Sequence, residues 1–578
     1  MKTLVAACTV ALGLAVSAGA DEDAAPPAVG STVRDISLKD IHRRSRSLGS
    51  FRDKKAIVVV FVGVECPLAN LYLPALAALH HEFAGQGVQF IAINSNDQDT
   101  FVQVSAHAQE RELPFPVLKD FDHAAADAFG ARRTPEAFLL DAGRTIRYRG
   151  RIDDQYGVTH RRDAPTRSDL KQAIADLLAG RPIATPETDV EGCIISRVRG
   201  PRVAGQVTYG NDVAPIIQKR CQECHRPGQI GPFSLLSYED ARDWADTIGE
   251  VVLERRMPPW HADPRFGKFA NDRRLTQREI DTLLAWVQQG SPRGRDPEPP
   301  PVAFTEGWTI GQPDAVFEMP TEFTAPATGT VPYKRFVVDP GFTEDRWVQA
   351  AEARPGNRAV VHHIIVYIKE AGKPLYALDG TASTLVGWAP GDMPAIYTPG
   401  TAKRIPAGSK FVFEMHYTPN GTEQTDRSRV GIIFAKEPPP HPVETNILAN
   451  MLFRIPPGAA EHRGQHVYTF REDSRLLSFM PHMHLRGLNA RYTATYPDGR
   501  NETLLAVPDY DFNWQSVYRF ADPPLMPKGT QLTWSAAWDN SADNPRNPDP
   551  TREVRWGEQT WDEMMNGWME SVPTSARD

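Results

Sequence analysis

Hydrophobic and polar positions alternate in two different rhythms along this chain, and the first rhythm fills its N-terminal third. Short apolar runs alternate there with longer amphipathic stretches. The runs span residues 56–64, 88–94, 137–140 and 146–152, and the stretches span 68–85 and 101–111. Short apolar runs are typical of buried strands, and the longer stretches favour helices. This order predicts an α/β sandwich domain over residues 29–180.

The second rhythm is a series of short β-type runs that fills the C-terminal half. Runs rich in Val, Ile, Phe and Tyr are separated by Gly, Pro and Asn, and the clearest span 360–368, 410–417, 430–435, 491–496 and 531–538. Many short strands with frequent turns predict all-β sandwich domains. A Pro-rich stretch at 292–303 precedes this region and predicts a semi-rigid, extended linker.

A short helical segment lies between these two regions. Residues 207–217 predict one helix, and residues 276–289 predict a second, amphipathic helix. The apolar side of the second helix is formed by Ile280, Leu283, Leu284 and Trp286. This pattern predicts a small all-α domain at 207–291, joined to the α/β domain by a linker at 181–206.

Length and charge narrow the class of protein. The chain has 578 residues, enough for about three or four domains with buried cores. Its formal net charge is −8 and no basic block stands out, so we expect no nucleic-acid partner.

The N-terminus has the pattern of a secretory signal peptide over residues 1–20. Lys2 precedes an apolar run at 4–16, and the small residues Ala18-Gly19-Ala20 follow it. The run is too short to span a bilayer, and no later stretch is long and apolar enough to do so. We therefore expect an exported, soluble protein, periplasmic or secreted, with no integral membrane segment.

Cysteine is rare in this chain, which predicts that each thiol has a specific role. Five cysteines occur, and Cys8 would leave with the signal peptide. Cys221-Gln222-Glu223-Cys224-His225 is a C-x-x-C-H sequence, the attachment signature of c-type haem. Cys221 and Cys224 would bind the haem covalently, and His225 would be the proximal iron ligand. The alternative is a disulfide or a zinc half-site, but no second Cys/His pair lies nearby to complete a zinc site. The domain resembles small bacterial cytochromes c.

The opposite face of the haem needs a sixth ligand, and Met257 is our prediction for it. It lies in Arg256-Met257-Pro258-Pro259-Trp260, where paired prolines stiffen the loop. Ligation by methionine and histidine raises the reduction potential of haem iron. His261 is the alternative ligand, and a methionine used only for packing is the other interpretation.

Cys66 marks a candidate thiol site in the α/β domain. It follows the first long strand and opens the next helix, where the helix dipole would lower the thiol pKa. Thr134-Pro135 before a strand looks like the cis-proline turn of thioredoxin-like folds, and the segment resembles the redoxin branch of that superfamily. Cys66-Pro67-Leu68-Ala69 lacks the second cysteine of C-x-x-C, and Gly63 stands where peroxiredoxins have threonine.

Cys193 is the only remaining thiol that could resolve or pair with Cys66. Two interpretations stay open. In the first, Cys66 and Cys193 form a working redox pair, for example in a thiol peroxidase. In the second, the domain is a degenerate redoxin used for docking, because fold does not imply function.

Six potential metal ligands occur in the β-rich region. They are His362 and His363 in VVHHIIVYI, His416 in FEMHYTP, His482 and His484 in FMPHMHLRG, and Met564 in DEMMNG. Imidazole suits several metals, but a thioether favours Cu(I), so the set predicts copper. His482 and His484 would point to the same face of a strand and could share one ion. Adjacent His362 and His363 would point to opposite faces, so joint binding requires a bulge or a strand end.

These motifs, in this order, resemble the ascorbate-dependent type II copper monooxygenases, the family of peptidylglycine α-hydroxylating and dopamine β-monooxygenases. The resemblance covers roughly residues 304–569. It implies two sandwiches, at 304–440 and 441–570, each supplying one copper site across a cleft. The first site, an electron relay, would be held by His362, His363 and His416. The second, where oxygen is activated, would be held by His482, His484 and Met564.

The sequence departs from this family at several positions. Family members contain disulfides, whereas residues 304–570 contain no cysteine, and Met565 stands where a cysteine usually follows the methionine ligand. Met480 and Trp568 replace the arginine and tyrosine that hold a substrate carboxylate in the peptide-processing enzymes. Without that guanidinium, a peptide ending in glycine is not the expected substrate. Met480 and Trp568 would line an apolar or aromatic pocket, or pack in the core.

We therefore expect an exported oxidoreductase with two copper ions and one covalently bound haem c. The main interpretation is a copper monooxygenase that hydroxylates a C–H bond of an unknown small molecule with O₂. Electrons would come from a small reductant or a cytochrome and pass through the fused haem. The alternative is a protein that transfers electrons or handles copper without oxygenating a substrate, with the redoxin domain as a thiol peroxidase or a docking module.

Overall fold

The computed structural model describes residues 27–158, 160–197, 203, 205–304, 307–375, 383–389 and 394–575. The signal peptide expected at 1–20 lies outside these residues. The chain divides into two compact units, with Met1–Ser37, Ser47–Ser95 and Asp122–Ile195 in the first and Leu38–Arg46, Asn96–Phe121 and Ser196–Asp578 in the second.

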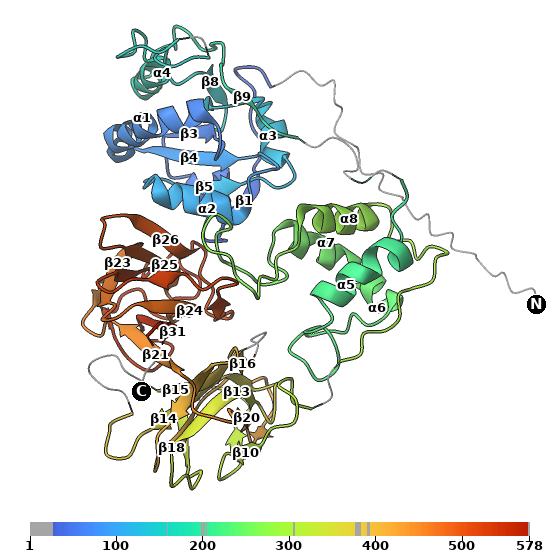
Figure 1. The fold of residues 1–578 in the computed structure, drawn as a ribbon. Coiled ribbons are helices and arrows are strands. Elements are labelled where there is room, and N and C mark those ends of the chain that lie inside the picture. The colour runs from blue at the N-terminus through green and yellow to red at the C-terminus, as the bar shows by residue number, and fades with distance from the viewer. Residues whose placement is uncertain are drawn as a thin grey trace, which may run out of the picture. The chain divides into compact units, whose positions relative to one another are not determined.

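The first unit is built on a sheet with the central order β4-β3-β7-β8. These strands are β3 (Ala56–Phe61), β4 (Val88–Asn94), β7 (Glu136–Asp141) and β8 (Ile146–Gly150). Strand β4 is parallel to β3, and β7 is antiparallel to it. Every residue of β3 is buried, which explains its unbroken apolar run. With helices α1 (Pro67–Phe83), α3 (Ala124–Phe129) and α4 (Asp169–Leu178), this sheet confirms the predicted α/β domain (Figure 1).

Further short elements lie close to this sheet in sequence. Strand β1 (Ser37–Asp40) pairs antiparallel with β5 (Val117–Lys119). Strand β2 (Ser45–Ser47) precedes the 3₁₀ turn η1 (Leu48–Phe51), and η2 (Ala84–Gln86) follows α1. Helix α2 (Phe101–Glu110) coincides with the helix predicted at 101–111.

After α4 the chain remains in the first unit, over residues that we expected to form a linker. Thr188 N–H donates to the Arg149 carbonyl at 3.1 Å. Further on, β9 (Cys193–Ile194) pairs antiparallel with β6 (Arg133–Thr134). Glycine permits this approach, because a Cβ on Gly192 would lie 2.1 Å from the Thr134 carbonyl oxygen. The prediction of a linker at 181–206 was therefore wrong up to Ile195, which belongs to the first unit.

A group of helices in the second unit buries Trp286 at its centre. A π-helical turn, η3 (Tyr209–Val213), leads into α5 (Ala214–Arg220), and the others are α6 (Tyr238–Asp243), α7 (Ala245–Leu253) and α8 (Gln277–Gln288). Helix α8 buries Ile280, Leu283 and Trp286 of the predicted apolar side and half-buries Leu284, and Thr276 with Glu279 forms its capping box. The first helix begins later than expected, at Tyr209, because Thr208 is extended and donates its N–H to Asp212 at 2.9 Å.

The segment between α7 and α8 packs elsewhere. Trp260 and Phe269 are buried in a core formed with the C-terminal β region, and Phe269 forms a β-bridge with Phe520. The residues predicted as one cytochrome domain therefore contribute to two cores. None of the helices in the described part of the chain is long and apolar enough to cross a membrane.

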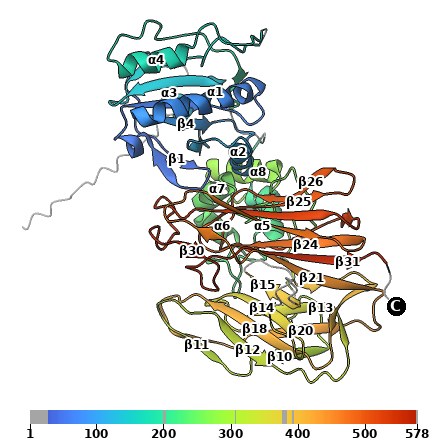
Figure 2. The same ribbon diagram turned by 90° about the vertical axis from the view of Figure 1, so that its left-hand side faces the viewer.

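The C-terminal region is all-β, as the pattern predicted, and one long sheet runs through it. That sheet has the order β10-β20-β13-β17-β21-β31-β24-β27. The sheet β12-β18-β14-β15 packs against its first half, and β23-β29-β25-β26 packs against its second half. The halves join where β17 (Thr401–Ile405) runs parallel to β21 (His441–Ala449). Figure 2 shows β24, β31 and β21 side by side.

The remaining strand bounds are as follows in chain order. They are β10 (Ala315–Glu318), β11 (Phe323–Ala325), β12 (Lys334–Val338), β13 (Arg346–Arg354), β14 (Val361–Lys369), β15 (Thr384–Trp388), β16 (Ala395–Ile396), β18 (Lys410–Tyr417), β19 (Gln424–Asp426), β20 (Arg429–Phe434), β22 (Arg454–Ile455), β23 (His462–Thr469), β24 (Ser474–His482), β25 (Gly487–Thr495), β26 (Asn501–Val507), β27 (Tyr518–Arg519), β28 (Leu525–Met526), β29 (Gln531–Trp538), β30 (Val554–Arg555) and β31 (Asn566–Pro573).

Candidate functional sites

Cys66 and Cys193 lie together in the first unit. Cys66 is the N-cap of α1, where its sulfur accepts the Ala69 N–H at 3.5 Å and its thiol donates to the Thr134 carbonyl at 3.0 Å. The Thr134–Pro135 peptide bond is cis, as the sequence predicted. Cys193 stands opposite Thr134 in the β6–β9 pair, and its thiol is hydrogen-bonded to that of Cys66.

The two thiols differ in exposure and in pKa. Cys66 is 3% exposed, whereas Cys193 is exposed. Burial disfavours the Cys66 thiolate, but hydrogen bonds with Thr134, the Ala69 N–H and Cys193 outweigh this effect and lower the Cys66 pKa. Loss of hydration, together with the neighbouring Cys66, raises the Cys193 pKa to about 11. A negative charge in the pair is therefore carried by Cys66.

The C-x-x-C-H sequence follows α5. His225 Nδ1 lies 3.2 Å from the Phe233 carbonyl oxygen. Because a carbonyl only accepts hydrogen bonds, Nδ1 carries the proton and Nε2 keeps its lone pair. Burial raises the pKa of the Cys221 thiol to about 12 and also raises that of Cys224. His225 therefore offers the Nε2 lone pair close in sequence to two thiols whose pKa values are raised by burial.

The two predicted sixth ligands face different surroundings. Met257 lines a cavity of about 440 Å³, but none of the cysteines and the histidine of the C-x-x-C-H sequence lines it. The structure therefore does not bring Met257 and His225 to one cavity. His261 is buried against the β region, where its Nδ1 lies 3.9 Å from Asp509 Oδ2.

The first predicted copper-ligand set meets where β14 pairs with β18. The register shifts between Val361 and His363, so His362 is the extra residue of a bulge. This bulge is the device that adjacent histidines require in order to face one point. The Nδ1 atoms of His362 and His363 lie 3.2 Å apart, and ligand atoms of these two residues and His416 all lie within 4.8 Å of one another. Two nitrogens about 2.0 Å from one tetrahedral ion would be about 3.3 Å apart, so the spacing fits a shared ion.

The second set lies at the end of β24. His482 is its last residue and His484 lies just beyond, with ring centroids 5.1 Å apart. His482 Nδ1 is 2.6 Å from Gln515 Oε1, and His484 Nδ1 is 3.4 Å from the Asp562 carbonyl oxygen. These acceptors place the protons on Nδ1 and leave both Nε2 atoms as ligands. Among the described residues, the buried His484 Nε2 has no hydrogen-bond partner.

Glu563 connects Met564 to the second set. Its carboxylate accepts the backbone N–H groups of His484 at 2.8 Å, Arg486 at 2.7 Å and Met564 at 3.3 Å. Burial raises the Glu563 pKa to about 7. Met564 is buried, and its sulfur accepts the Asn566 amide at 3.2 Å. Glu563 thus ties the backbone of Met564 to that of the second set.

The two histidine sets form one cluster, which we call the histidine cluster, in place of the two sites across a cleft that we expected. The rings of His363 and His482 have centroids 6.4 Å apart. Phe512 packs between the sets, and its ring centroid lies 5.2 Å from that of His362 and 5.9 Å from that of His484. Burial lowers the pKa of His362 to about 4 and that of His482 to about 4, so these imidazoles are neutral at neutral pH.

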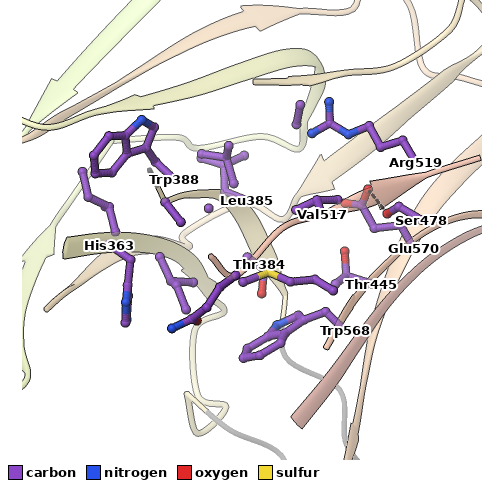
Figure 3. Close-up of a pocket in the computed structure, with 18 of the residues that line it drawn as sticks. His363, Thr384, Leu385, Trp388, Thr445, Ser478, Val517, Arg519, Trp568 and Glu570 are labelled. Atoms are coloured by element: carbon purple, nitrogen blue, oxygen red, sulfur yellow. Dashed lines mark hydrogen bonds between the residues drawn. The ribbon is translucent and has the colours of Figure 1, made fainter. Parts of the chain in front are cut away.

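A cavity of about 80 Å³ lies beside the histidine cluster. His363 stands at one end, and Arg519, Ser478 and Glu570 stand at the other (Figure 3). The apolar walls between these ends include Leu385, Trp388, Val517 and Trp568. Glu570 is paired with the Lys403 ammonium at 2.7 Å, so the polar end is largely compensated within the protein.

The sequence predicted some of the residues that line the cavity and not others. Met480 and Trp568 line the cavity, one of the two uses predicted for them. Arg519 also lines it and supplies a guanidinium that the family comparison did not anticipate. Gln515 and Glu563 were missed as well, because Gln515 lies in no motif and Glu563, although it lies in DEMMNG, was assigned no role. The one available signal was the acidic residue adjacent to Met564 in DEMMNG.

Comparison with known proteins characterises the first part of the chain. Residues 29–149 match the model of the AhpC/TSA family. The thiol-disulfide oxidoreductase ResA of Geobacillus thermodenitrificans is 28% identical over 142 residues, which cover 24% of this chain and 80% of the relative. ResA of Halalkalibacterium halodurans is 27% identical, covering 24% of this chain and 77% of the relative. A hypothetical protein from Sinorhizobium meliloti, known from a crystal structure, is 33% identical to this chain in sequence. The match covers 30% of this chain and 97% of the solved chain, with a TM-score of 0.29.

The sheet, the cis-proline turn and the cysteine at the start of α1 define a thioredoxin-like redoxin domain. Within that class, residues 29–149 are similar to the AhpC/TSA family. These matches span less than a third of the chain, so they characterise this domain and not the whole protein.

Proposed function

We propose that this protein is a thiol–disulfide oxidoreductase whose redoxin domain cycles Cys66 and Cys193 between dithiol and disulfide. The observation that carries the proposal is the pairing of β9 with β6, which holds Cys193 opposite Thr134 while Cys66 donates to the Thr134 carbonyl. Relatives named as thiol-disulfide oxidoreductases support the same chemistry. Cys193 would replace the second cysteine that is missing from Cys66-Pro67-Leu68-Ala69.

The chemistry is an exchange between two dithiol/disulfide pairs. When the protein disulfide accepts two electrons from a partner dithiol, the Cys66–Cys193 bond breaks and the partner's disulfide forms, with no net change in protons. The reverse reaction would reduce a partner disulfide.

The test is direct. The full chain is oxidised with glutathione disulfide, and its peptides are mapped by mass spectrometry. We expect a Cys66–Cys193 linkage in the wild type and none in Cys66→Ser or Cys193→Ser. An oxidised wild type in which both thiols remain free would overturn the proposal.

The histidine cluster favours a second function. We propose that this cluster is a copper-dependent monooxygenase centre. The donor set fits copper, because His484 Nε2 and His416 Nδ1 are buried without a hydrogen-bond partner in the described part of the chain. His362, His363 and His416 would hold one ion, and His482, His484 and Met564 the other. Bound copper would supply one-electron redox chemistry and O₂ activation.

The chain's own residues would prepare this centre. Gln515 and the Asp562 carbonyl fix the tautomers of His482 and His484, and Glu563 holds the backbone of His484 and Met564. The apolar walls of the cavity would bind a small molecule beside His363 and exclude water from it. The substrate of this reaction would be a small molecule with an apolar body.

A covalent haem would complete the electron supply. Cys221 and Cys224 would attach it, and the Nε2 lone pair of His225 would bind its iron. The haem would supply one-electron redox chemistry. Export across a membrane, as the N-terminal pattern predicts, would place the protein where c-type haem is attached.

These proposals are tested on the exported holoprotein. We expect two coppers per chain, a pyridine-haemochrome band that survives denaturation, and O₂ uptake that yields a hydroxylated product. Zinc in preference to copper, or O₂ uptake with no hydroxylated product, would contradict the monooxygenase. The double variant Cys221→Ala plus Cys224→Ala should lose the haem band. A band that persists in this variant would contradict haem attachment.

A further inference from the structure

The segment that carries Cys193 is fixed to the redoxin sheet at two places. At its start, Thr188 Oγ1 accepts the Arg151 N–H at 3.0 Å and lies 2.8 Å from the Tyr148 hydroxyl. A Cβ on Gly150 would lie 2.0 Å from Thr188 Oγ1, so glycine is needed there for the segment to approach. These contacts anchor the chain upstream of β9.

The downstream anchor lies at β9 itself. The Arg133 guanidinium donates to the Gly192 carbonyl at 2.7 Å, and Ile195 N–H donates to the Arg132 carbonyl at 2.9 Å. Cys193 is held between these two hydrogen bonds. Its position beside Cys66 is therefore built by the fold and does not depend on a disulfide.

The two cysteine residues are unequally exposed. Cys66 is 3% exposed, whereas Cys193 is exposed and its neighbour Ile194 is 71% exposed. A thiol in solution, or one on the surface of another protein, can therefore approach Cys193 without any movement of the redoxin domain. Cys66, in contrast, is buried, so a thiol outside the protein meets Cys193 first.

We infer that Cys193 is the entry sulfur of this redoxin, so that an external thiolate attacks Cys193 and Cys66 leaves. This inference rests on the proposed thiol–disulfide function and gives its order of steps. The partner is a dithiol that can reach the exposed Cys193.

The steps balance. One thiolate of the partner forms a bond to Cys193 Sγ, the Cys66–Cys193 bond breaks, and Cys66 leaves as a thiolate. The second thiol of the partner, deprotonated, then attacks the partner's own sulfur in the mixed disulfide and releases Cys193, which takes up a proton. The partner is oxidised to a disulfide, and the protein is reduced to the dithiol.

The hydrogen bonds at Cys66 favour this direction. Disulfide exchange is faster when the departing sulfur is the more stable thiolate. Cys66 is that sulfur, since Ala69 N–H and Thr134 stabilise its charge and its pKa is lowered, whereas the Cys193 pKa is raised to about 11. Stabilisation of the reduced form also makes the disulfide a better oxidant.

The experiment identifies the sulfur that is attacked. Oxidised full-length protein is mixed with reduced glutathione, quenched at successive times with an excess of N-ethylmaleimide and mapped by mass spectrometry. We expect the glutathione adduct on Cys193 and the maleimide on Cys66, with the Cys193 adduct in excess by at least about tenfold at the earliest times. Samples of Cys66→Ser and Cys193→Ser treated with glutathione disulfide provide reference masses for each single adduct.

The possible outcomes distinguish the entry role of Cys193 from the thiol–disulfide function on which it rests. An adduct found mainly on Cys66, or in equal amounts on both cysteines, overturns the entry role of Cys193 and leaves the redox pair intact. A chain that forms no Cys66–Cys193 disulfide before glutathione is added overturns the thiol–disulfide function itself.

Discussion

The thiol site joins the start of α1 to the β6–β9 pair, whereas the histidine cluster draws its side chains from β14, β18, β24 and the loop after β24. At the thiol site, two sulfurs are placed by backbone pairing and can be changed singly with little effect on the fold. At the histidine cluster, buried imidazoles depend on a bulge, on Gln515 and on Glu563 for their orientation. A site built on backbone pairing is expected to be robust, and one built from buried polar side chains is expected to be sensitive to its neighbours.

The sharpest way to separate the two sites is to remove each in turn. Cys66→Ser should abolish the internal disulfide completely and leave the copper content unchanged. His482→Ala combined with His484→Ala should remove one of two coppers and leave disulfide formation unchanged. Metal analysis and peptide mapping on the same preparations measure both quantities, and a loss of copper from the thiol variant would show that the sites are not independent.

The proximity of the two histidine sets predicts a magnetic interaction. Because His363 and His482 have ring centroids 6.4 Å apart, two Cu(II) ions held by the sets should be coupled. Dipolar coupling should then broaden the electron paramagnetic resonance lines at two coppers per chain. His482→Ala with His484→Ala should restore the narrower lines of a single ion. Lines in the wild type as narrow as those of this variant would contradict this geometry.

Glu563 is expected to position ligands without binding metal. In Glu563→Gln, only one oxygen can accept the three backbone N–H groups that the carboxylate now holds, so His484 and Met564 should lose their fixed positions. Copper affinity should fall about 10- to 100-fold, as measured by competition with a chelator. Glu553→Gln, an exposed change at a residue paired with Arg555, is the matched control. Equal affinity in both variants would contradict the positioning role.

The β9 anchor can be weakened without touching either sulfur. In Gly192→Ala, the new Cβ would lie 2.1 Å from the Thr134 carbonyl oxygen, so β9 should move away from Cys66. The rate of internal disulfide formation should fall about tenfold or more, because the two thiols lose their fixed proximity. In Gly85→Ala the added Cβ meets nothing within 4 Å, and the rate should not change.

The smallest expected effect concerns the pH dependence of Cys66. Its hydrogen bond with Cys193 helps to lower the Cys66 pKa, so Cys193→Ser should retain part of that effect and Cys193→Ala should remove it. The pH at which alkylation of Cys66 is half-maximal should therefore be higher in Cys193→Ala than in Cys193→Ser. An identical midpoint would show that Thr134 and Ala69 alone set the pKa.

Several features follow from the sequence because their causes are local. Strands β4, β18 and β29 have the predicted bounds, since apolar periodicity acts within one element. Helix α8 starts after the capping pair Thr276 and Glu279, which lie three residues apart. The bulge at His362 could also be anticipated, because adjacent residues of a regular strand cannot face one point.

Other features were decided only by the tertiary structure. These features join residues far apart in the chain. Strand β9 pairs with β6, and the two sandwiches join where β17 pairs with β21. Gln515 and Glu563 form hydrogen bonds with histidines that are distant from them in the sequence. Strand pairing depends on which sheet edges meet, and a buried hydrogen bond depends on which side chains are enclosed together. No periodicity or cap encodes either choice. The sequence by itself therefore determined the elements and the chemical types of the ligands, while the fold decided which of them became neighbours.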